Sequence, residues 1–191
     1  MKIICATTNR GKLREFWMKA GVEVEPLPGL ESIPACGETG STFEENAIQK
    51  ALYYGAYTDG FLIAEDSGLE VEALGGAPGV FSARFAGPDA TDEDNNRLLL
   101  EKLGETRDRV ARYVSVIALT RAGRIVATFR GEVEGEITLQ PRGANGFGYD
   151  PLFFYRSFGC TFGEASPERK HAVSHRGRAL DELFRRLSVT S

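Results

Sequence analysis

The sequence predicts an α/β fold, a mixed β-sheet with flanking helices, in a single domain over residues 1–191. Three observations predict this fold. Short apolar runs typical of buried strands alternate with segments of helical periodicity in the first half of the chain. Two longer strand-like segments then follow each other as in a hairpin, which adds antiparallel pairing to the sheet. No internal repeat, low-complexity tract or linker-like run divides the chain.

The chain opens with a predicted strand and helix. Residues 2–7 (K-I-I-C-A-T) form a short apolar run that predicts a buried strand. A helix is predicted over Gly11–Ala20, because apolar residues recur there at the spacing of one helix face: Leu13, Phe16, Trp17 and Ala20.

A second helix is predicted to begin at Ser41 or Thr42. Each is followed three residues later by a glutamate, Glu44 or Glu45, which is the capping-box pattern. Its buried stripe is expected to consist of Phe43, Ala47, Ile48 and Ala51.

The middle of the chain predicts two strands and a third helix. The run Phe61–Glu65 indicates a buried strand that ends at Asp66-Ser67-Gly68, and Leu69–Leu74 alternates as a surface strand does. Residues 91–94 can cap a helix whose apolar residues are Leu98, Leu99 and Leu103.

The last part predicts a hairpin and a final helix. Residues 110–120 and 124–138 indicate two strands joined at Ala122-Gly123. The final helix is expected to pack on the core through Leu180, Leu183, Phe184 and Leu187.

Composition predicts a soluble cytoplasmic protein. The chain is 42% hydrophobic and 26% charged, and its 3 cysteines are too few for a disulfide scaffold. The apolar run Ile3–Ala6 is too short for the hydrophobic region of a signal peptide, and no stretch is long enough to span a bilayer. We therefore expect reduced thiols and no membrane partner.

The charge distribution is more informative than the net charge of −4. Residues 23–101 carry 16 acidic and 3 basic residues, whereas both ends of the chain are basic. Nucleic-acid binders usually show a broad basic face, so no nucleic-acid partner is expected. Carboxylates that hold a divalent cation and basic residues that bind phosphates fit this pattern, although a solvated acidic face explains the charge alone more simply.

The first candidate site is the segment T-T-N-R-G-K, from Thr7 to Lys12. It lies between the first predicted strand and helix, where backbone N–H groups at a helix start favour phosphate. Asn9 can hold the turn, and Gly11 lets the chain pass close to a ligand. Lys12 adds a positive charge. The Walker A pattern is absent from the chain, and a plain strand–helix turn is the alternative.

The second candidate site is a group of acidic residues. Glu65 and Asp66 stand at a predicted strand end, where ligands gather in α/β sheets. Neighbouring side chains on a strand point opposite ways, so both acids reach one metal only if the strand bends at Ser67-Gly68. Asp66 is the better candidate for a metal ligand or base, with Glu65 behind it or bound through water. Glu38 lies in a loop between Gly37 and Gly40, and Mg²⁺ takes one or two such carboxylates. Surface solvation is the alternative for any one of these acids.

Two further segments carry candidate residues. The glycine-rich run from Gly143 to Pro151 can approach a flat ring and stack on it, or form a glycine-rich turn with buried aromatics. In the basic run 170–178, His171 and His175 are four residues apart and can share a helix face. A zinc site lacks a third ligand at suitable spacing there. Lys170, His175 and Arg176 instead indicate hydrogen-bond donors for an anion or for the oxygen edge of a base, and a solvated basic helix is the alternative.

Taken together, these segments resemble the inosine/xanthosine triphosphate pyrophosphatase family. The resemblance rests on motifs in order along nearly the whole chain: T-T-N-R-G-K, E-T-G-S-T-F-E-E-N-A, E-D-S-G-L, L-G-G-A-P-G-V-F-S-A-R-F, G-F-G-Y-D-P and V-S-H-R-G-R-A-L. It implies a sheet in two lobes around a long active-site cleft, a homodimer, and a cytoplasmic hydrolase for non-standard purine nucleoside triphosphates (ITP, dITP and XTP).

The resemblance also implies a role for each matching residue. Glu38 and Asp66 bind Mg²⁺, Asp66 accepts the proton, and His175 and Arg176 contact the base. The triphosphate is implied to bind Thr7, Thr8, Asn9, Arg10, Gly11 and Lys12. The other implied substrate contacts are Ser67, Phe147, Gly148, Tyr149, Asp150 and Lys170, with Phe147 stacking on the base. Glu65 stands where many bacterial members have aspartate, which leaves its contact with the metal open.

The reaction implied is hydrolysis between the α and β phosphates, with nucleoside monophosphate and pyrophosphate as products. Two other functions are weighed against it. A pyrimidine nucleotide pyrophosphatase is disfavoured by S-H-R-G and F-G-Y-D-P. A regulator that binds triphosphate without cleaving it is disfavoured by the full set of acidic residues, because binding alone needs no base beside a metal.

Overall fold

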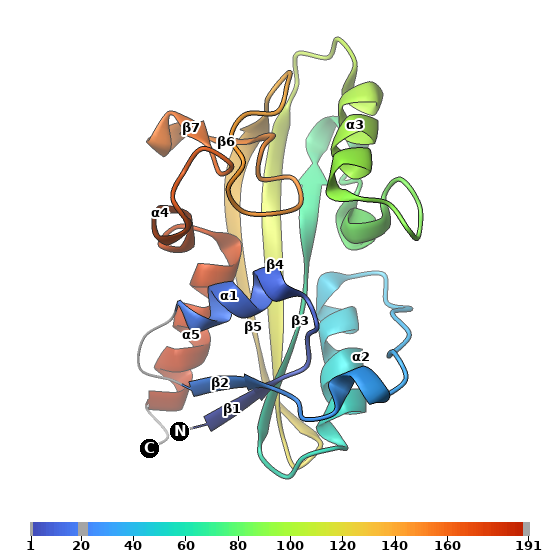
Figure 1. Ribbon diagram of the computed structural model, residues 1–191, viewed down its shortest axis with the longest axis vertical. Helices are drawn as coiled ribbons and strands as arrows, with labels where there is room; N and C mark the ends of the chain where they lie inside the picture. The colour runs from blue at the N-terminus through green and yellow to red at the C-terminus, as the bar shows by residue number, and fades with distance from the viewer. Residues whose placement is uncertain (1, 19–22, 189–191) are drawn as a thin grey trace. The chain divides into compact units, whose positions relative to one another are not determined.

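A computed structural model describes residues 2–18 and 23–188 of the chain (Figure 1). Its strands form one sheet in the order β2-β1-β3-β4-β5-β6-β7. The strands are β1 (Lys2–Cys5), β2 (Glu23–Pro26), β3 (Phe61–Val71), β4 (Val110–Arg121), β5 (Arg124–Ile137), β6 (Phe153–Tyr155) and β7 (Cys160–Thr161). The helices are α1 (Arg10–Trp17), α2 (Phe43–Gly55), α3 (Asp92–Leu103), α4 (Pro167–His171) and α5 (His175–Ser188), and 3₁₀ turns span Leu30–Ser32, Glu72–Leu74, Gly79–Arg84 and Arg156–Phe158.

The sheet is mixed, as the sequence predicts. Strand β1 runs parallel to both of its neighbours, with Ile3 opposite Val24 and Ile4 opposite Leu62. Strand β6 is antiparallel to β5 and to β7. The α/β class with flanking helices is therefore confirmed.

The contacts of the chain divide it into two compact units. Unit 1 comprises residues 1–66, 115–131 and 175–191, and unit 2 comprises residues 67–114 and 132–174. Each unit has its own apolar core. The single domain and the cleft between lobes stay predictions.

The core of unit 1 lies between the sheet and two helices. Phe16 of α1 is buried, and so is the apolar stripe of α5 that the sequence predicts (Leu180, Leu183, Phe184 and Leu187). Helix α1 is shorter than predicted, and Ala20 lies outside the described residues. Trp17 is 56% exposed, and its indole N–H donates to the Val24 carbonyl.

Local capping signals in the sequence predict the helix starts well. Thr42 caps α2, where its hydroxyl accepts the N–H of Glu45. Thr91 and Asp94 form a complete capping box at α3. The predicted hairpin is also confirmed, because β4 and β5 are joined by Ala122 and Gly123, which both have positive φ, as a two-residue hairpin turn requires.

The prediction that a strand ends at Asp66 is wrong. Strand β3 continues through Ser67 and Gly68 to Val71. Gly68 permits close packing here, since a Cβ would lie 2.3 Å from the Ser82 hydroxyl oxygen. Leu69 and Val71 are fully buried in the core of unit 2 and Glu70 between them is half-buried, so the predicted alternation holds over residues 69–71. The predicted extent to Leu74 is wrong, because residues 72–74 form a 3₁₀ turn.

No helix in the described part of the chain is long and apolar enough to cross a membrane.

Candidate active site

The segment from Thr7 to Lys12 comprises the end of the loop after β1 and the first residues of α1, so it lies between strand and helix as predicted. Asn9 caps the helix, since its side-chain oxygen accepts the N–H of Lys12 at 3.0 Å. The Asn9 N–H in turn donates to the Thr7 hydroxyl at 3.2 Å. Thr8, Asn9 and Arg10 are exposed, so the N-terminus of α1 is accessible to an anionic ligand.

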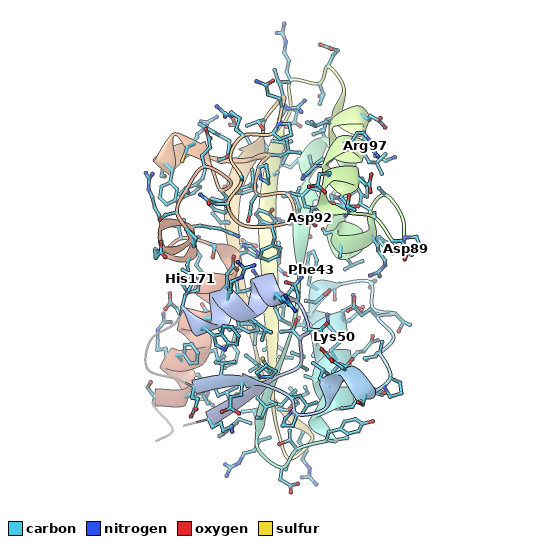
Figure 2. All side chains as sticks on the ribbon, viewed as in Figure 1. Phe43, Lys50, Asp89, Asp92, Arg97 and His171 are labelled. Atoms are coloured by element: carbon cyan, nitrogen blue, oxygen red, sulfur yellow. The ribbon has the colours of Figure 1, made fainter. Side chains whose placement is uncertain are left out.

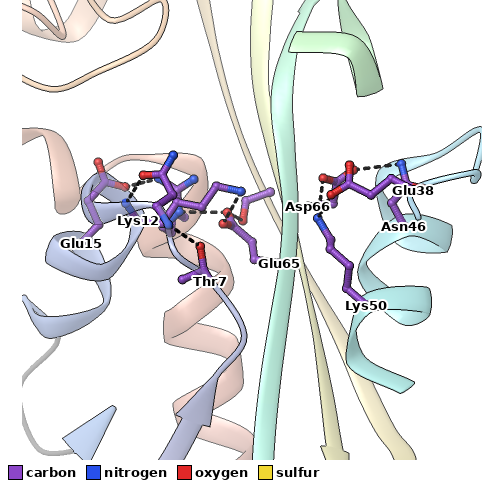
Figure 3. Close-up of polar contacts among 11 residues, drawn as sticks. Thr7, Lys12, Glu15, Glu38, Asn46, Lys50, Glu65 and Asp66 are labelled. Atoms are coloured by element: carbon purple, nitrogen blue, oxygen red, sulfur yellow. Dashed lines mark hydrogen bonds and ion pairs between the residues drawn. The ribbon is translucent and has the colours of Figure 1, made fainter. Parts of the chain in front are cut away.

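Glu65 and Asp66 point to opposite faces of β3 (Figure 3). Glu65 faces Lys12, whereas Asp66 faces Glu38 and Lys50. The strand continues through Ser67, and neighbouring side chains keep the alternation of a regular strand. Glu65 is therefore turned away from Asp66.

Glu65 is the centre of a buried ion network. Its carboxylate accepts from the Arg176 Nε at 2.9 Å and from the Ser115 hydroxyl at 2.7 Å, and it pairs with the Lys12 ammonium at 3.1 Å. Burial raises the pKa of the Glu65 carboxyl, but Arg176 and Lys12 outweigh burial and hold that pKa well below its usual range. Glu65 is thus ionised at neutral pH and pairs with two cations.

The two cations of this network are buried to different degrees. The Lys12 side chain is 17% exposed, and burial lowers the pKa of its ammonium although Glu65 opposes the change. Arg176 is 1% exposed and also contacts Glu15. Burial alone would lower the pKa of its guanidinium, but Glu65 and Glu15 outweigh burial and raise that pKa above its usual value. Arg176 therefore stays charged. His175 directly precedes Arg176 at the start of α5 and is buried too.

Glu38 and Asp66 converge on one cationic group. The Lys50 ammonium lies 2.9 Å from Glu38 Oε1 and 2.9 Å from Asp66 Oδ1 (Figure 3). Two carboxylates directed at one point are the oxygen donors that Mg²⁺ prefers. The described residues hold no cluster of three His, Cys, Asp or Glu suited to a metal. A Mg²⁺ ion with two protein carboxylates fits this arrangement, because that ion usually keeps several waters.

The environment of Asp66 also suits a proton acceptor. Burial raises the pKa of its carboxyl, and the nearby Lys50 ammonium only partly offsets that effect. Asn46 donates from Nδ2 to Asp66 Oδ2 at 3.2 Å, so one carboxylate oxygen contacts Asn46 and the other contacts Lys50. The carboxylate is held in a fixed orientation.

Helix α2 supplies residues that the sequence interpretation missed. Asn46 Oδ1 accepts the Gly40 N–H at 2.8 Å, Gln49 Oε1 accepts the Thr39 N–H at 3.2 Å, and Lys50 holds Glu38. These three side chains share one face of α2 and fix the loop that carries Glu38. Their polarity on the inner face of a capped helix is the one signal in the sequence that could have indicated them.

Gly40 is required for this packing. A Cβ at Gly40 would lie 2.6 Å from the Glu45 Cβ and 2.7 Å from Asn46 Oδ1. The glycine of the motif E-T-G therefore serves the close approach of the loop to α2.

The second group of candidate residues lies in unit 2. Asp150 accepts the Lys170 ammonium at 2.6 Å and the Phe147 N–H at 2.9 Å, both at Oδ2. Asp150 and Lys170 are almost fully buried. The Lys170 ammonium lies 5.0 Å from the centroid of the Phe147 ring, a cation–π distance. Gly146 makes room for this arrangement, since a Cβ there would lie 1.9 Å from Asp150 Oδ2.

Tyr149 and Ser67 have different surroundings. The Tyr149 hydroxyl is buried and donates to the Ser82 carbonyl at 2.8 Å. Burial raises the pKa of this phenol. Ser67 is half-buried on β3, next to Asp66 in the sequence. Their predicted contacts with substrate stay predictions, as does the contact of Arg176 with the base.

The prediction that the two histidines share a helix face is wrong. His171 is the last residue of α4, whereas His175 is the first residue of α5. The turn at residues 172–174 separates the two helices, so helical spacing does not apply across it.

Comparison with known proteins decides the family. The model of the Ham1 family matches residues 3–186. The chain belongs to the Ham1 family. This confirms the resemblance that the ordered motifs predict, and the match spans both units.

Members of the Ham1 family with known names are similar along almost their whole length. A dITP/XTP pyrophosphatase of an Exiguobacterium species is 50% identical, over 96% of this chain and 95% of the relative. A dITP/XTP pyrophosphatase of Bacillus licheniformis is 44% identical, over 95% of each chain. The solved structure of the Staphylococcus aureus Ham1 protein has a TM-score of 0.90 at 41% identity and covers 100% of both chains.

Proposed function

We propose that this Ham1 protein hydrolyses dITP, ITP and XTP to the nucleoside monophosphate and pyrophosphate. The observation that carries the proposal is the convergence of Glu38 and Asp66 on one cation position. A buried, oriented carboxylate of raised pKa is what a hydrolase needs to accept a proton from water. The relatives named dITP/XTP pyrophosphatase support the choice of substrate.

The phosphates are assigned to the loop from Thr7 to Lys12. The exposed start of α1 offers backbone N–H groups and the positive end of the helix dipole. Lys12 adds an ammonium whose direction is fixed by Glu65. Positioning and charge stabilisation of this kind make up most of what a phosphate-transferring site contributes.

Glu38 and Asp66 are assigned as the ligands of Mg²⁺. When bound, Mg²⁺ supplies positive charge that neutralises phosphate oxygens. Asp66 orients the attacking water and takes its proton, and Lys50 and Asn46 keep the carboxylate in place. The Lys50 ammonium pairs with both carboxylates and partly neutralises their charge.

The base is assigned to Phe147, with His175 and Arg176 as the groups that distinguish purines. Hypoxanthine and xanthine carry an oxygen acceptor at position 6, where adenine carries an amino group. A donor from His175 or Arg176 would pair with the oxygen and would face an unpaired donor in adenine. Lys170 and Asp150 hold the Phe147 ring in place. We further propose a cytoplasmic homodimer, as the family resemblance implies, and sedimentation of the purified protein tests the dimer.

A substrate panel tests the proposed function. Purified protein with Mg²⁺ is incubated separately with dITP, XTP, GTP, ATP and UTP, and pyrophosphate and orthophosphate are measured. We expect pyrophosphate from dITP and XTP and little from ATP. Pyrophosphate mainly from UTP would favour the pyrimidine enzyme instead. Nucleotide binding without any product would favour a regulator.

A further inference from the structure

We propose that Asp92 and Asn96 of α3 position the loop that carries Phe147 and thereby set how tightly the protein binds the purine base. The inference deepens the proposed function and rests on it, because that function assigns the base to Phe147. Neither residue belongs to the motifs that identify the family. Both lie in unit 2 with the loop that they contact.

One residue of the loop is held from both sides by the same helix. Asp92 Oδ2 accepts the N–H of Gly148 at 2.6 Å. Asn96 Nδ2 donates to the carbonyl of the same glycine at 3.0 Å. Asp92 lies in the first turn of α3 (Figure 2), and Asn96 follows four residues later on the same helix face. The helix therefore fixes both polar backbone groups of Gly148.

This fixation determines the path of the chain next to Phe147. Gly148 has a φ of +63°, which side chains other than glycine rarely adopt. On its other side, the Phe147 N–H is bound by Asp150 Oδ2 at 2.9 Å. The backbone that carries the ring is thus anchored before and after it. If α3 released Gly148, the glycine could rotate and the ring would lose its fixed direction.

The environment of Asn96 indicates a role other than stability. Asn96 is 7% exposed, and its Oδ1 accepts no hydrogen bond from any described residue. A buried acceptor without a partner destabilises a fold, and an apolar side chain of similar volume would avoid that cost. The carboxamide supplies one thing here that leucine cannot, the donor to Gly148.

Three variants test the role of the two residues. Asp92→Ala removes the acceptor for Gly148, and Asp92→Asn retains an acceptor oxygen and should restore the function. Asn96→Leu removes the donor and keeps the volume of the side chain. The matched control is Glu93→Ala, which removes the same charge from the same helix turn. Glu93 is exposed and makes no hydrogen bond or ion pair with the described residues of the loop.

The expected effect is on base binding and not on the reaction at phosphate. We expect Asp92→Ala and Asn96→Leu each to raise the KM for dITP roughly tenfold, within the range that loss of aromatic stacking on a base produces. We expect kcat to change much less. Inorganic tripolyphosphate has no base, so its inhibition constant should stay the same in every variant. Glu93→Ala and Asp92→Asn should resemble the wild type in all three quantities.

A double-mutant cycle with Phe147→Ala shows whether the effect passes through the ring. In that background, Asp92→Ala should add little, because the stacking that it disturbs is already gone. Full additivity of the two substitutions would overturn the inference. An equal loss of affinity for dITP and tripolyphosphate would also overturn it. So would an unchanged KM for dITP in both Asp92→Ala and Asn96→Leu.

Direct binding separates this inference from the proposed function. Calorimetry with dITP in the absence of divalent metal gives the same comparison without turnover. If the wild type binds dITP but does not hydrolyse it, the proposed function fails and the calorimetric comparison still decides the role of α3. If the wild type neither binds nor hydrolyses dITP, both fail.

Discussion

Replacing Lys50 with methionine should make the stability of the fold depend on a divalent cation. In the wild type the Lys50 ammonium pairs with Glu38 and with Asp66, each at 2.9 Å. Lys50→Met keeps much of the volume of the side chain but leaves two carboxylates facing each other. Because the Asp66 side chain is 9% exposed, water screens little of their repulsion.

The size of the effect follows from the burial of the three groups. Removing one partner of a buried ion pair costs about 3–5 kcal/mol. The Glu38 side chain is 27% exposed and partly screened, so we take the lower end, about 3 kcal/mol. For a protein of this length each kcal/mol lowers Tm by about 2–4 °C. The variant should therefore melt about 6–12 °C below the wild type in EDTA.

Mg²⁺ should reverse most of this loss. A cation that binds only the folded state at about 100 times its Kd stabilises it by about 2.7 kcal/mol. The gain should be smaller in the wild type, where Lys50 already neutralises the two carboxylates. Calorimetric melting of both proteins with EDTA and with Mg²⁺ measures the difference.

The control for Lys50→Met is the same substitution at an exposed ion pair. Lys2 pairs with Glu25 at 2.6 Å, but its side chain is 53% exposed, so Lys2→Met should change Tm little and independently of Mg²⁺. If Mg²⁺ raised the Tm of Lys50→Met no more than that of the wild type, Glu38 and Asp66 would not form a metal site.

Three further predictions follow from the same contacts. Asp66→Asn should lower kcat roughly 10²–10⁴-fold if Asp66 takes the proton from water, and a nearly normal rate would remove it from that role. Arg176→Ala should reduce the discrimination between ITP and ATP without weakening Mg²⁺ binding; an equal loss of rate with both substrates would instead make Arg176 a structural or phosphate-binding residue. Glu65→Gln should change the dependence of stability on pH. The ionised Glu65 stabilises the fold above the unfolded-state pKa of about 4.5, and this contribution fades as the pH falls below that value, because the folded-state pKa is lower. Melting temperatures between neutral and acidic pH should therefore fall less steeply in Glu65→Gln, and parallel curves would show that Glu65 carries none of the acid sensitivity.

The parts of the fold that depend on neighbouring residues could be predicted from the sequence. Thr42 and Thr91 cap their helices because a hydroxyl and an acid three residues later act within one turn. The turn at Ala122 and Gly123 likewise depends only on local backbone geometry. These interactions leave a pattern in a short stretch of sequence.

Gly68 shows where this approach fails. A glycine after two acids indicates a turn, but its missing Cβ serves a contact with Ser82, which is 14 residues further along the chain. The pattern of a turn and the pattern of a close approach look the same in the sequence. Only the packing of β3 against the 3₁₀ turn at Gly79–Arg84 distinguishes them.

The sequence indicates candidate ligands, whose roles stay predictions, but not the residues that hold them in place. Glu38, Asp66 and Lys12 stand in motifs, and their charge points to phosphate and metal chemistry. Lys50 was missed because its partners lie 12 and 16 residues away on other elements, at no regular spacing. The pairing of Arg176 with Glu65 joins residues 111 positions apart, which no local pattern can reveal.

The bond that the protein cleaves can be identified with isotopically labelled water. Hydrolysis of dITP in ¹⁸O-water, followed by mass spectrometry of both products, shows which phosphorus the water attacks. We expect the label in the monophosphate, together with unlabelled pyrophosphate, because attack at the α-phosphorus expels pyrophosphate intact. Label in the pyrophosphate, or release of orthophosphate from dITP, would contradict the proposed reaction.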